Sequence, residues 1–196
     1  KGAVTSDGLP RSEKSASIAA GVHAGLIPVV GKITGHPENK TGLVMTLIEP
    51  NFMNLAAPPS LESCTRDIYA AETKFNLASA INIALTIAGV AQHIHAQGVM
   101  HGDLYAHNIL WDGKDKCLLG DFGGASFVPQ HDANLATGLQ RIEVRAFACL
   151  LEELLERCDA PAEAQHIVNA LRDLQLRSDE AEVNARPLID EIHSTL

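Results

Sequence analysis

The segment between residues 101 and 123 restricts the possible folds of this chain more than any other stretch. It reads HGDLYAHNILWDGKDKCLLGDFG, in which two short apolar runs, NILW and CLLG, flank the polar turn DGKDK. An Asp-Gly pair between two strand-like runs predicts a β-hairpin. Antiparallel pairing places the start of the first strand beside the end of the second, so Asn108 and Asp121 become neighbours.

Three oxygen-bearing side chains are then expected on one rim of this hairpin: Asp103, Asn108 and Asp121. Magnesium prefers hard oxygen ligands, and phosphoryl transfer needs an acceptor hydroxyl held in line with the phosphate. Asp103 can orient that hydroxyl and take its proton, while Asn108 and Asp121 can hold a metal ion that bridges nucleotide phosphates. Taken singly, each residue is also explained by turn and cap chemistry. Taken together, they predict a phosphoryl-transfer site.

The rest of the chain predicts a small strand-bearing front end and a mainly helical back end. Strands are expected at 26–33 and 42–48. Helices are predicted at 12–20, 61–74, 75–96, 144–154, 163–174 and 188–196. The helix at 75–96 carries apolar residues on two faces and should be buried on most sides. Its most apolar part, 80–91, is too short to span a bilayer.

Charge and cysteine content narrow the class of protein. The 196 residues are 46% apolar and carry a formal net charge of −9. Nucleic acid and anionic membrane are not expected as partners, because both need clustered Lys and Arg. The four cysteines form no CxxC motif and no metal-ligand spacing, so reduced thiols and a cytoplasmic location are expected. The first residue is Lys1 instead of methionine, so the chain is expected to be a fragment.

Four ordered motifs resemble landmarks of the protein kinase-like superfamily. HGDLYAHN at 101–108 is similar to its catalytic-loop pattern H-R-D-L-x-x-x-N, and DFG at 121–123 follows the hairpin. EVRAFACLLEELL at 143–155 resembles the central helix of the large lobe, and ARPLIDEI at 185–192 resembles its closing segment. Four motifs in this order are far more specific than any single one. A further likeness is to kinase domains attached to bacterial leucine-rich-repeat proteins.

The resemblance implies an α+β, protein kinase-like fold with a mainly helical C-terminal lobe and an incomplete β-rich N-terminal lobe. Residues 1–49 would form the partial small lobe, residues 50–60 the hinge or connector, and residues 61–196 the large lobe. Glu13 would be the ion-pairing glutamate of the regulatory helix.

The resemblance also implies an activity, the transfer of the γ-phosphate of ATP to a protein hydroxyl with Mg2+ as a second cofactor. Asp103 would be the base, and Asn108 and Asp121 would bind both the metal ion and the nucleotide. Three residues on the strand that leads into the hinge, called the hinge residues below, would complete the nucleotide site: Met45, which is near the usual gatekeeper position, Thr46 and Ile48. A protein substrate is therefore the expected partner besides ATP.

Several residues depart from the family pattern. The sequence contains no glycine-rich phosphate loop and no V-A-I-K strand, and no APE motif lies between 123 and 143. Gly102 replaces an arginine that, in many kinases, receives a phosphate from the activation segment. Tyr105 stands where many serine/threonine kinases carry lysine, and His107 stands where tyrosine kinases place arginine. Glu143 replaces an aspartate and keeps a carboxylate that can accept backbone N–H groups of the catalytic loop.

These departures leave three functions open. The first is a protein kinase, which is expected to be inactive or impaired as this chain alone. The second is a pseudokinase that binds partners without catalysis, and the third is a small-molecule kinase of the aminoglycoside type, which shares the HGD form. A zinc site on His93 and His95 is disfavoured, because a two-residue step on a helix turns their rings about 200° apart. His101 is better explained as a packed residue that supports the catalytic loop.

Overall fold

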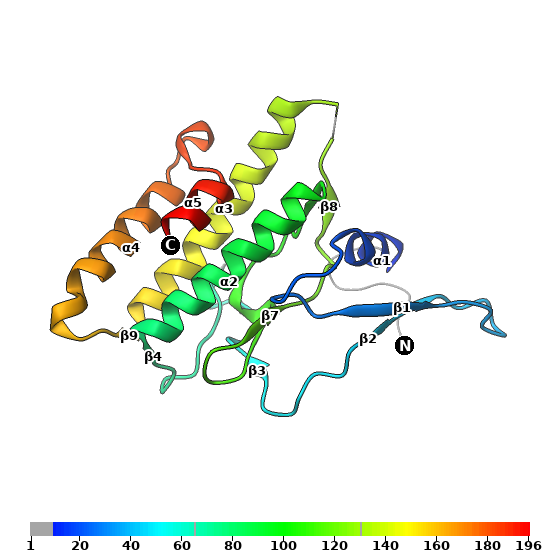
Figure 1. Ribbon diagram of the computed structural model, residues 1–196, viewed down its shortest axis with the longest axis horizontal. Coiled ribbons are helices and arrows are strands. Elements are labelled where there is room, and N and C mark those ends of the chain that lie inside the picture. Colours follow the sequence, from blue (N-terminus) through cyan, green and yellow to red (C-terminus); the bar gives the residue numbers. More distant parts are fainter. Residues whose placement is uncertain (1–9, 65, 130) are drawn as a thin grey trace.

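The computed structural model describes residues 10–64, 66–129 and 131–196, which form an α+β arrangement (Figure 1). The α-helices are α1 (Pro10–Ala19), α2 (Leu77–Ala96), α3 (Ala133–Glu156), α4 (Gln165–Ser178) and α5 (Ile189–Thr195). The strands are β1 (Val29–Ile33), β2 (Gly42–Met45), β3 (Met53–Asn54), β4 (Phe75–Asn76), β5 (Val99–Met100), β6 (Ile109–Trp111), β7 (Cys117–Leu119), β8 (Ser126–Phe127) and β9 (Cys158–Asp159). Short 3-10 turns are η1 (Ala106–Asn108), η2 (Ala162–Ala164) and η3 (Val183–Ala185). The long helices lie together on one side, while β1 and β2 project as a ribbon at the other end.

Helix α2 is the centre of the hydrophobic core. Asn76 caps it, because its side-chain oxygen accepts a hydrogen bond from the Ser79 N–H at 2.8 Å. Its isoleucines Ile83, Ile87 and Ile94 are fully or almost fully buried, and the helix packs against α3, α5 and β7. Burial of one such side chain contributes about 1.5–3 kcal/mol. The expectation of a helix that is buried on most sides is confirmed.

Helix α2 extends beyond both ends of the apolar stretch 80–91. At 20 residues it is long and apolar enough, by length and composition, to cross a membrane. However, 56% of its most apolar window is buried inside the protein. A long helix at the centre of a core passes the same test, because burial against other helices also selects apolar residues on every face. Burial in the core therefore accounts for the composition of α2.

The predicted β-hairpin is confirmed. Strands β6 and β7 pair antiparallel, with Ile109 opposite Leu119 and Trp111 opposite Cys117. Strand β3 adds to the outer side of β6, so the three strands form one small sheet. Because β3 lies within residues 50–60, part of the expected connector is a strand of this sheet. The domain boundaries at 49 and 60 stay a prediction.

The two front strands are present but shorter than predicted. Strand β1 begins at Val29 instead of residue 26, and β2, its antiparallel partner, ends at Met45 instead of residue 48. Pro28 has no N–H to donate, and its carbonyl oxygen accepts the Thr46 N–H at 3.0 Å, so the ladder ends there. Leu26 instead forms a β-bridge to β7, which links the front ribbon to the hairpin.

The prediction of a helix at 61–74 is wrong for the described residues of that range, which form turns, a β-bridge and irregular segments. This segment makes long-range contacts in place of helical hydrogen bonds. Ile68 pairs with Ala57 in an isolated β-bridge, and the hydroxyl of Tyr69 donates to Glu153 of α3 at 3.1 Å. These tertiary contacts outweigh the local helix propensity, which is a weak preference.

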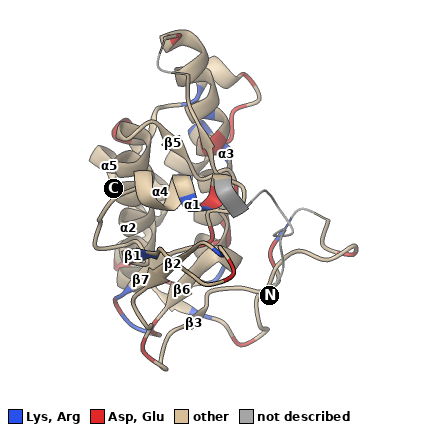
Figure 2. Cartoon of the chain, turned by 90° about the vertical axis from the view of Figure 1, so that its right-hand side faces the viewer, with Lys and Arg blue, Asp and Glu red and all other residues tan. Residues whose placement is uncertain are grey.

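Charged residues are spread over loops and helices. Figure 2 shows Lys and Arg interspersed with Asp and Glu over the described part of the chain. Several form ion pairs, such as Arg145 with Asp179 at 3.1 Å and Arg66 with Glu152. Exposed pairs of this kind contribute less than about 1 kcal/mol each. The fold therefore depends mainly on the core around α2.

Candidate active site

The motif at 101–108 is held in place by buried residues. It connects β5 to β6, and His101, Leu104 and Ala106 are almost completely buried. The Nε2 atom of His101 lies 2.8 Å from the carbonyl oxygen of Gly120, and its ring centroid lies 5.0 Å from that of Phe122. The prediction that His101 is a packed residue supporting this loop is confirmed. The loop is thereby tied to the segment that carries DFG.

Asp103 and Asn108 are in direct contact. The Nδ2 atom of Asn108 donates to the backbone oxygen of Asp103 at 2.9 Å and to its Oδ2 atom at 2.7 Å. Because the amide nitrogen of Asn108 donates to Asp103, the amide oxygen of Asn108 is available for a cation. The Asp103 side chain is 28% exposed, so a substrate can reach it from solvent.

The hairpin brings Asp121 beside this pair, as the antiparallel register predicted. The N–H of Gly120 donates to the carbonyl oxygen of Asn108 at 3.0 Å. Asp121 itself has a φ of 52°, a left-handed conformation that is uncommon for a residue other than glycine. Its Oδ1 atom accepts the N–H of Gly123 at 3.0 Å. We call the group formed by Asp103, Asn108 and Asp121 the catalytic rim.

Asn108 and Asp121 suit a magnesium ion that is bound together with a nucleotide. Both residues offer hard oxygen atoms, which Mg2+ prefers. Among the described residues, no group of three or more His, Cys, Asp or Glu side chains is placed to hold a metal ion. An ion at the catalytic rim would therefore take further oxygens from phosphates and water, which is the usual way that Mg2+ is bound beside a nucleotide.

Asp67 is a residue that the sequence reasoning missed. Its Oδ1 atom lies 2.8 Å from Nδ1 of His107, and its Oδ2 atom accepts the backbone N–H of His107 at 2.9 Å. The other ring nitrogen of His107, Nε2, lies 3.1 Å from Oδ2 of Asp103. Asp67 and His107 are 40 positions apart, so no local motif joins them. In the sequence, the feature that could have pointed to Asp67 was an aspartate in a segment without a strong helix pattern.

The two carboxylates change the acid–base behaviour of His107. Burial by itself lowers the pKa of this histidine. Hydrogen bonds and negative charge from Asp67, followed by the charge of Asp103, outweigh burial and raise the pKa of His107 above its ordinary value. The ring is therefore charged over a wider pH range than a solvent-exposed histidine.

Glu143 of α3 joins the catalytic loop to the helical core. Its Oε1 atom accepts the N–H of Gly102 at 2.6 Å, and its Oε2 atom lies 2.6 Å from Nε2 of His95. The prediction that Glu143 accepts a backbone N–H group of this loop is confirmed. His93 instead bonds the carbonyl oxygen of Ala20 at 2.8 Å, so the two rings diverge as helix geometry predicted.

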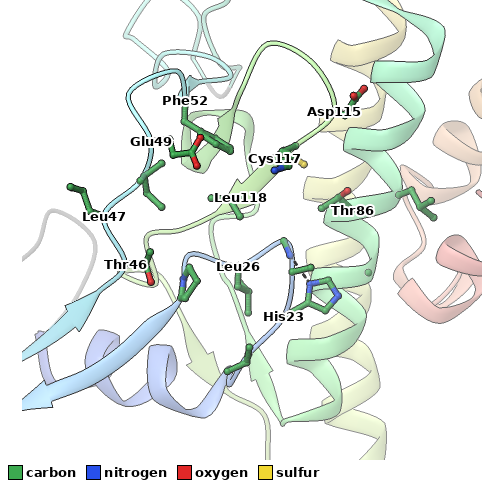
Figure 3. Close-up of a pocket in the computed structure, with 18 of the residues that line it drawn as sticks. His23, Leu26, Thr46, Leu47, Glu49, Phe52, Thr86, Asp115, Cys117 and Leu118 are labelled. Carbon is green, nitrogen blue, oxygen red and sulfur yellow. Dashed lines mark hydrogen bonds between the residues drawn. The ribbon is translucent and has the colours of Figure 1, made fainter.

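Two of the three predicted hinge residues line a cavity that the catalytic rim does not border. Thr46 and Ile48 line a cavity of about 910 Å3, whose other walls come from α2, β7 and the loop before β1 (Figure 3). Met45, at the end of β2, does not line this cavity, and neither does any residue of the catalytic rim. The structure thus brings the catalytic and metal-ligand candidates together, whereas Thr46 and Ile48 line a cavity outside this group. Glu13 lies in α1, and its backbone oxygen accepts the hydroxyl of Ser17 at 2.8 Å.

An aspartate and an asparagine bonded within one loop, beside DFG on an α+β scaffold, are typical of the kinase-like phosphotransferases. A family model described as protein kinase domain matches residues 42–142, which is more than half of the chain. The chain therefore belongs to the protein kinase domain family. The expectation of a protein kinase-like fold, drawn from four ordered motifs, is confirmed at the level of the superfamily.

A plant protein supports the same family. The chain is 26% identical over 111 residues to a probable serine/threonine-protein kinase of Arabidopsis thaliana. The match covers 56% of this chain and 14% of the plant protein, so the chain spans a small part of the relative that it matches. The likeness to bacterial leucine-rich-repeat kinases stays a prediction.

Proposed function

We propose that this protein transfers the γ-phosphoryl group of ATP to a hydroxyl of a protein substrate, with Mg2+ bound at the catalytic rim. Asp103 orients the acceptor hydroxyl and takes its proton, while Asn108 and Asp121 hold the metal ion. When bound, Mg2+ neutralises negative charge on the phosphates. The nucleotide is bordered on its other side by three hinge residues: Met45, Thr46 and Ile48.

The contact between Asn108 and Asp103 carries this proposal. The Oδ2 atom of Asp103 accepts from Asn108 at 2.7 Å and lies 3.1 Å from Nε2 of His107. Over the described ranges, the Oδ1 atom of Asp103 makes no hydrogen bond. One carboxylate oxygen is therefore held and the other is open to an acceptor hydroxyl. This is the geometry that a general base needs.

Phosphotransfer with labelled ATP tests the role of Asp103. The protein is given a panel of protein, sugar and aminoglycoside acceptors. We expect label on protein, and we expect Asp103→Asn to lower the rate by about 10²- to 10⁴-fold, because a general base contributes that much. Unchanged turnover in the variant would show that Asp103 is not the general base. If only a sugar or an aminoglycoside is labelled, the protein is a small-molecule kinase and not a protein kinase.

A thermal-shift titration with ATP, with and without Mg2+, tests the nucleotide site separately from the chemistry. A ligand that binds only the folded protein raises its melting temperature. We expect a Mg2+-dependent shift that is lost in Asp121→Ala and kept in Asp103→Asn. Asp173→Ala on the exposed side of α4 is the matched control, and its shift should equal that of the wild type.

An interaction module without catalysis is the second candidate. Gly102 and Tyr105 favour it, because they stand where many kinases carry an arginine and a lysine. The absence of a Mg2+-dependent shift and of phosphotransfer in the full gene product would favour this candidate over the enzyme.

A cytoplasmic location is also proposed. The four cysteines, which all lie in the described ranges, are free thiols, and free thiols persist most readily in a reducing compartment. Fractionation of cells that express the tagged full gene product checks this location.

A further inference from the structure

The short turn that carries Asn108 does not cap itself. Asn108 is the last residue of η1, which is three residues long, and the residue before this turn, Tyr105, makes no side-chain capping bond. Two backbone bonds close the turn, from the N–H of Asn108 to Tyr105 and from the N–H of Ile109 to Ala106. Neither of them uses the N–H of His107. The first N–H groups of a helical turn need partners from outside it, so the conformation of this turn depends on other parts of the chain.

Asp67 supplies the missing cap. Its Oδ2 atom accepts the N–H of His107 at 2.9 Å, and its Oδ1 atom lies 2.8 Å from Nδ1 of the same residue. Aspartate is among the side chains that cap helical turns best. Here the cap comes from a residue 40 positions away, in place of the residue that precedes the turn. The side chain of Asp67 is 1% exposed, so this bond is shielded from water.

A second side chain holds His107 from its other backbone group. The amide of Asn54, on β3, donates to the carbonyl oxygen of His107 at 2.7 Å. Side chains from outside the loop therefore bond both the N–H and the C=O of this residue. The carbonyl oxygen of the next residue, Asn108, accepts the N–H of Gly120 at 3.0 Å. The backbone is thus fixed on both sides of the Asn108 side chain.

Asp67 is itself anchored to helix α3 by its chain neighbours. The Nη1 atom of Arg66 lies 3.5 Å from Oε1 of Glu153, and the hydroxyl of Tyr69 donates to Oε2 of the same glutamate at 3.1 Å. A buried carboxylate costs free energy unless donors satisfy its oxygens, and Asp67 directs both oxygens at His107. Asp67 therefore connects the core helix α3 to the turn of the catalytic loop.

We propose that Asp67 is a positioning residue for the metal ion: by capping the turn at His107, it sets the direction of the side-chain oxygen of Asn108. The inference rests on the proposed function, because it takes Asn108 as a metal ligand. Without the cap, the turn can rotate and carry Asn108 away from Asp103, to which its amide donates at 2.7 Å. A displaced oxygen ligand weakens the binding of Mg2+, because this ion demands a near-ideal octahedral geometry.

Hydrogen exchange of backbone amides, followed by NMR on the protein without metal or nucleotide, tests the cap. We expect the N–H of His107 to exchange at least about tenfold faster in Asp67→Ala, because its acceptor is gone. In Asp67→Asn the exchange should stay within about threefold of the wild type, since the amide oxygen can accept the same N–H. Leu174→Ala, which removes a buried side chain of α4, is the control for a general loss of stability and should not single out the N–H of His107.

Calorimetric titration with ATP, with and without Mg2+, tests the effect of the cap on the metal site. We expect Asp67→Ala to weaken the binding of ATP with Mg2+ by about tenfold and the binding of ATP alone by less than about twofold, because the cap acts on Asn108 and not on the hinge residues. Asp67→Asn should bring the affinity for ATP with Mg2+ back to within about threefold of the wild type. Both variants lack the negative charge, so the difference between them measures the hydrogen bond. Leu174→Ala should bind ATP with Mg2+ as the wild type does, which a merely structural effect would not allow.

A second variant keeps the test open if Asp67→Ala does not fold. Asn54 is exposed on β3, so Asn54→Ala leaves the core intact and releases the carbonyl oxygen of His107. We expect Asn54→Ala to weaken the binding of ATP with Mg2+ by about threefold, less than Asp67→Ala, because a hydrogen bond at the surface can be replaced by water.

The outcomes separate this inference from the proposed function. A folded Asp67→Ala or, in its place, Asn54→Ala that binds ATP with Mg2+ as tightly as the wild type overturns the positioning role alone. An equal loss of affinity in Asp67→Ala and Asp67→Asn overturns it as well. A wild type that binds ATP with Mg2+ but transfers no phosphate overturns the proposed function, while the expected loss in Asp67→Ala would still support the positioning role. A wild type that binds ATP no better with Mg2+ than without it overturns both.

Discussion

The catalytic loop at 101–108 and the hinge residues within 45–48, which we call the hinge segment, were predicted to serve one site, but the protein holds them very differently. In the loop, His101 is 0% exposed and Leu104 is 1% exposed. In the hinge segment, Met45 is 44% exposed and Leu47 is 93% exposed. Side chains from three other parts of the chain bond the loop, at Asp67, Glu143 and Asn54.

The difference separates two requirements of a phosphotransferase. Groups that touch reacting atoms must be held closely, since a small displacement costs much of the rate. Groups that border a flat ring of the nucleotide act mainly through apolar contact and backbone, and tolerate a less rigid support. The core around α2 therefore holds the catalytic side chains in place. The hinge segment has less support from the core, so its conformation depends more on the bound nucleotide.

The strongest test of the comparison replaces one leucine by alanine in each region. Leu104→Ala should lower the free energy of unfolding by about 3 kcal/mol, because it leaves a cavity under the catalytic loop. Leu47→Ala should change it by less than about 0.5 kcal/mol, because its side chain is 93% exposed. Urea unfolding of both variants measures the effect. Equal losses would mean that the hinge segment is as closely packed as the loop.

A smaller effect is expected from the backbone of the loop. Gly102 has a φ of 78°, and a Cβ atom there would lie 2.1 Å from the carbonyl oxygen of Gly124. Gly102→Ala should therefore cost about 2–3 kcal/mol, part from the left-handed backbone and part from the clash. Gly113 has nearly the same φ, 80°, with nothing within 4 Å, so Gly113→Ala should cost only about 1 kcal/mol. Chemical denaturation of both variants measures the cost of the clash as the difference between them. Equal costs would show that the backbone at Gly124 can move away from the loop.

The smallest expected effect is a change of stability with pH, which comes from Glu153, a neighbour of Asp67. Burial raises the pKa of Glu153 from 4.5 to about 7, against the opposing hydrogen bond from Tyr69. Between these two values the native state holds a proton that the unfolded chain has released, so stability falls as the pH rises from about 4.5 to about 7. Glu153→Gln stays neutral and should gain on the order of 1 kcal/mol over the wild type when the pH is raised through this window.

Thermal unfolding of the Glu153→Gln variant at both ends of that window measures this gain. Glu156→Gln is the control, because the Glu156 side chain is 61% exposed. A Glu153 variant that follows the wild type at every pH would show that the carboxylate ionises normally in the folded protein.

Much of the fold and of the catalytic rim could be predicted from sequence. The hairpin followed from the Asp-Gly turn between NILW and CLLG, and its register made Asn108 and Asp121 neighbours, as the bond from Gly120 to Asn108 confirms. The contact of Glu143 with the catalytic loop followed from its place in the kinase-like helix. The helix at 61–74 failed because Ile68 and Tyr69 are engaged in contacts with distant residues, which no local pattern records.

The sequence by itself determined the family, the order of the motifs and the residue types of the catalytic rim. Each motif is a short stretch of neighbouring residues, so it can be recognised without knowledge of the fold. Only the tertiary structure decided what surrounds them. It paired Asp67 with His107 across 40 positions. It also left no room for a side chain at Gly102 and formed a cavity that Thr46 and Ile48 line and the rim residues do not. Such contacts follow from how helices and loops pack in space, and packing joins residues whose separation along the chain carries no signal.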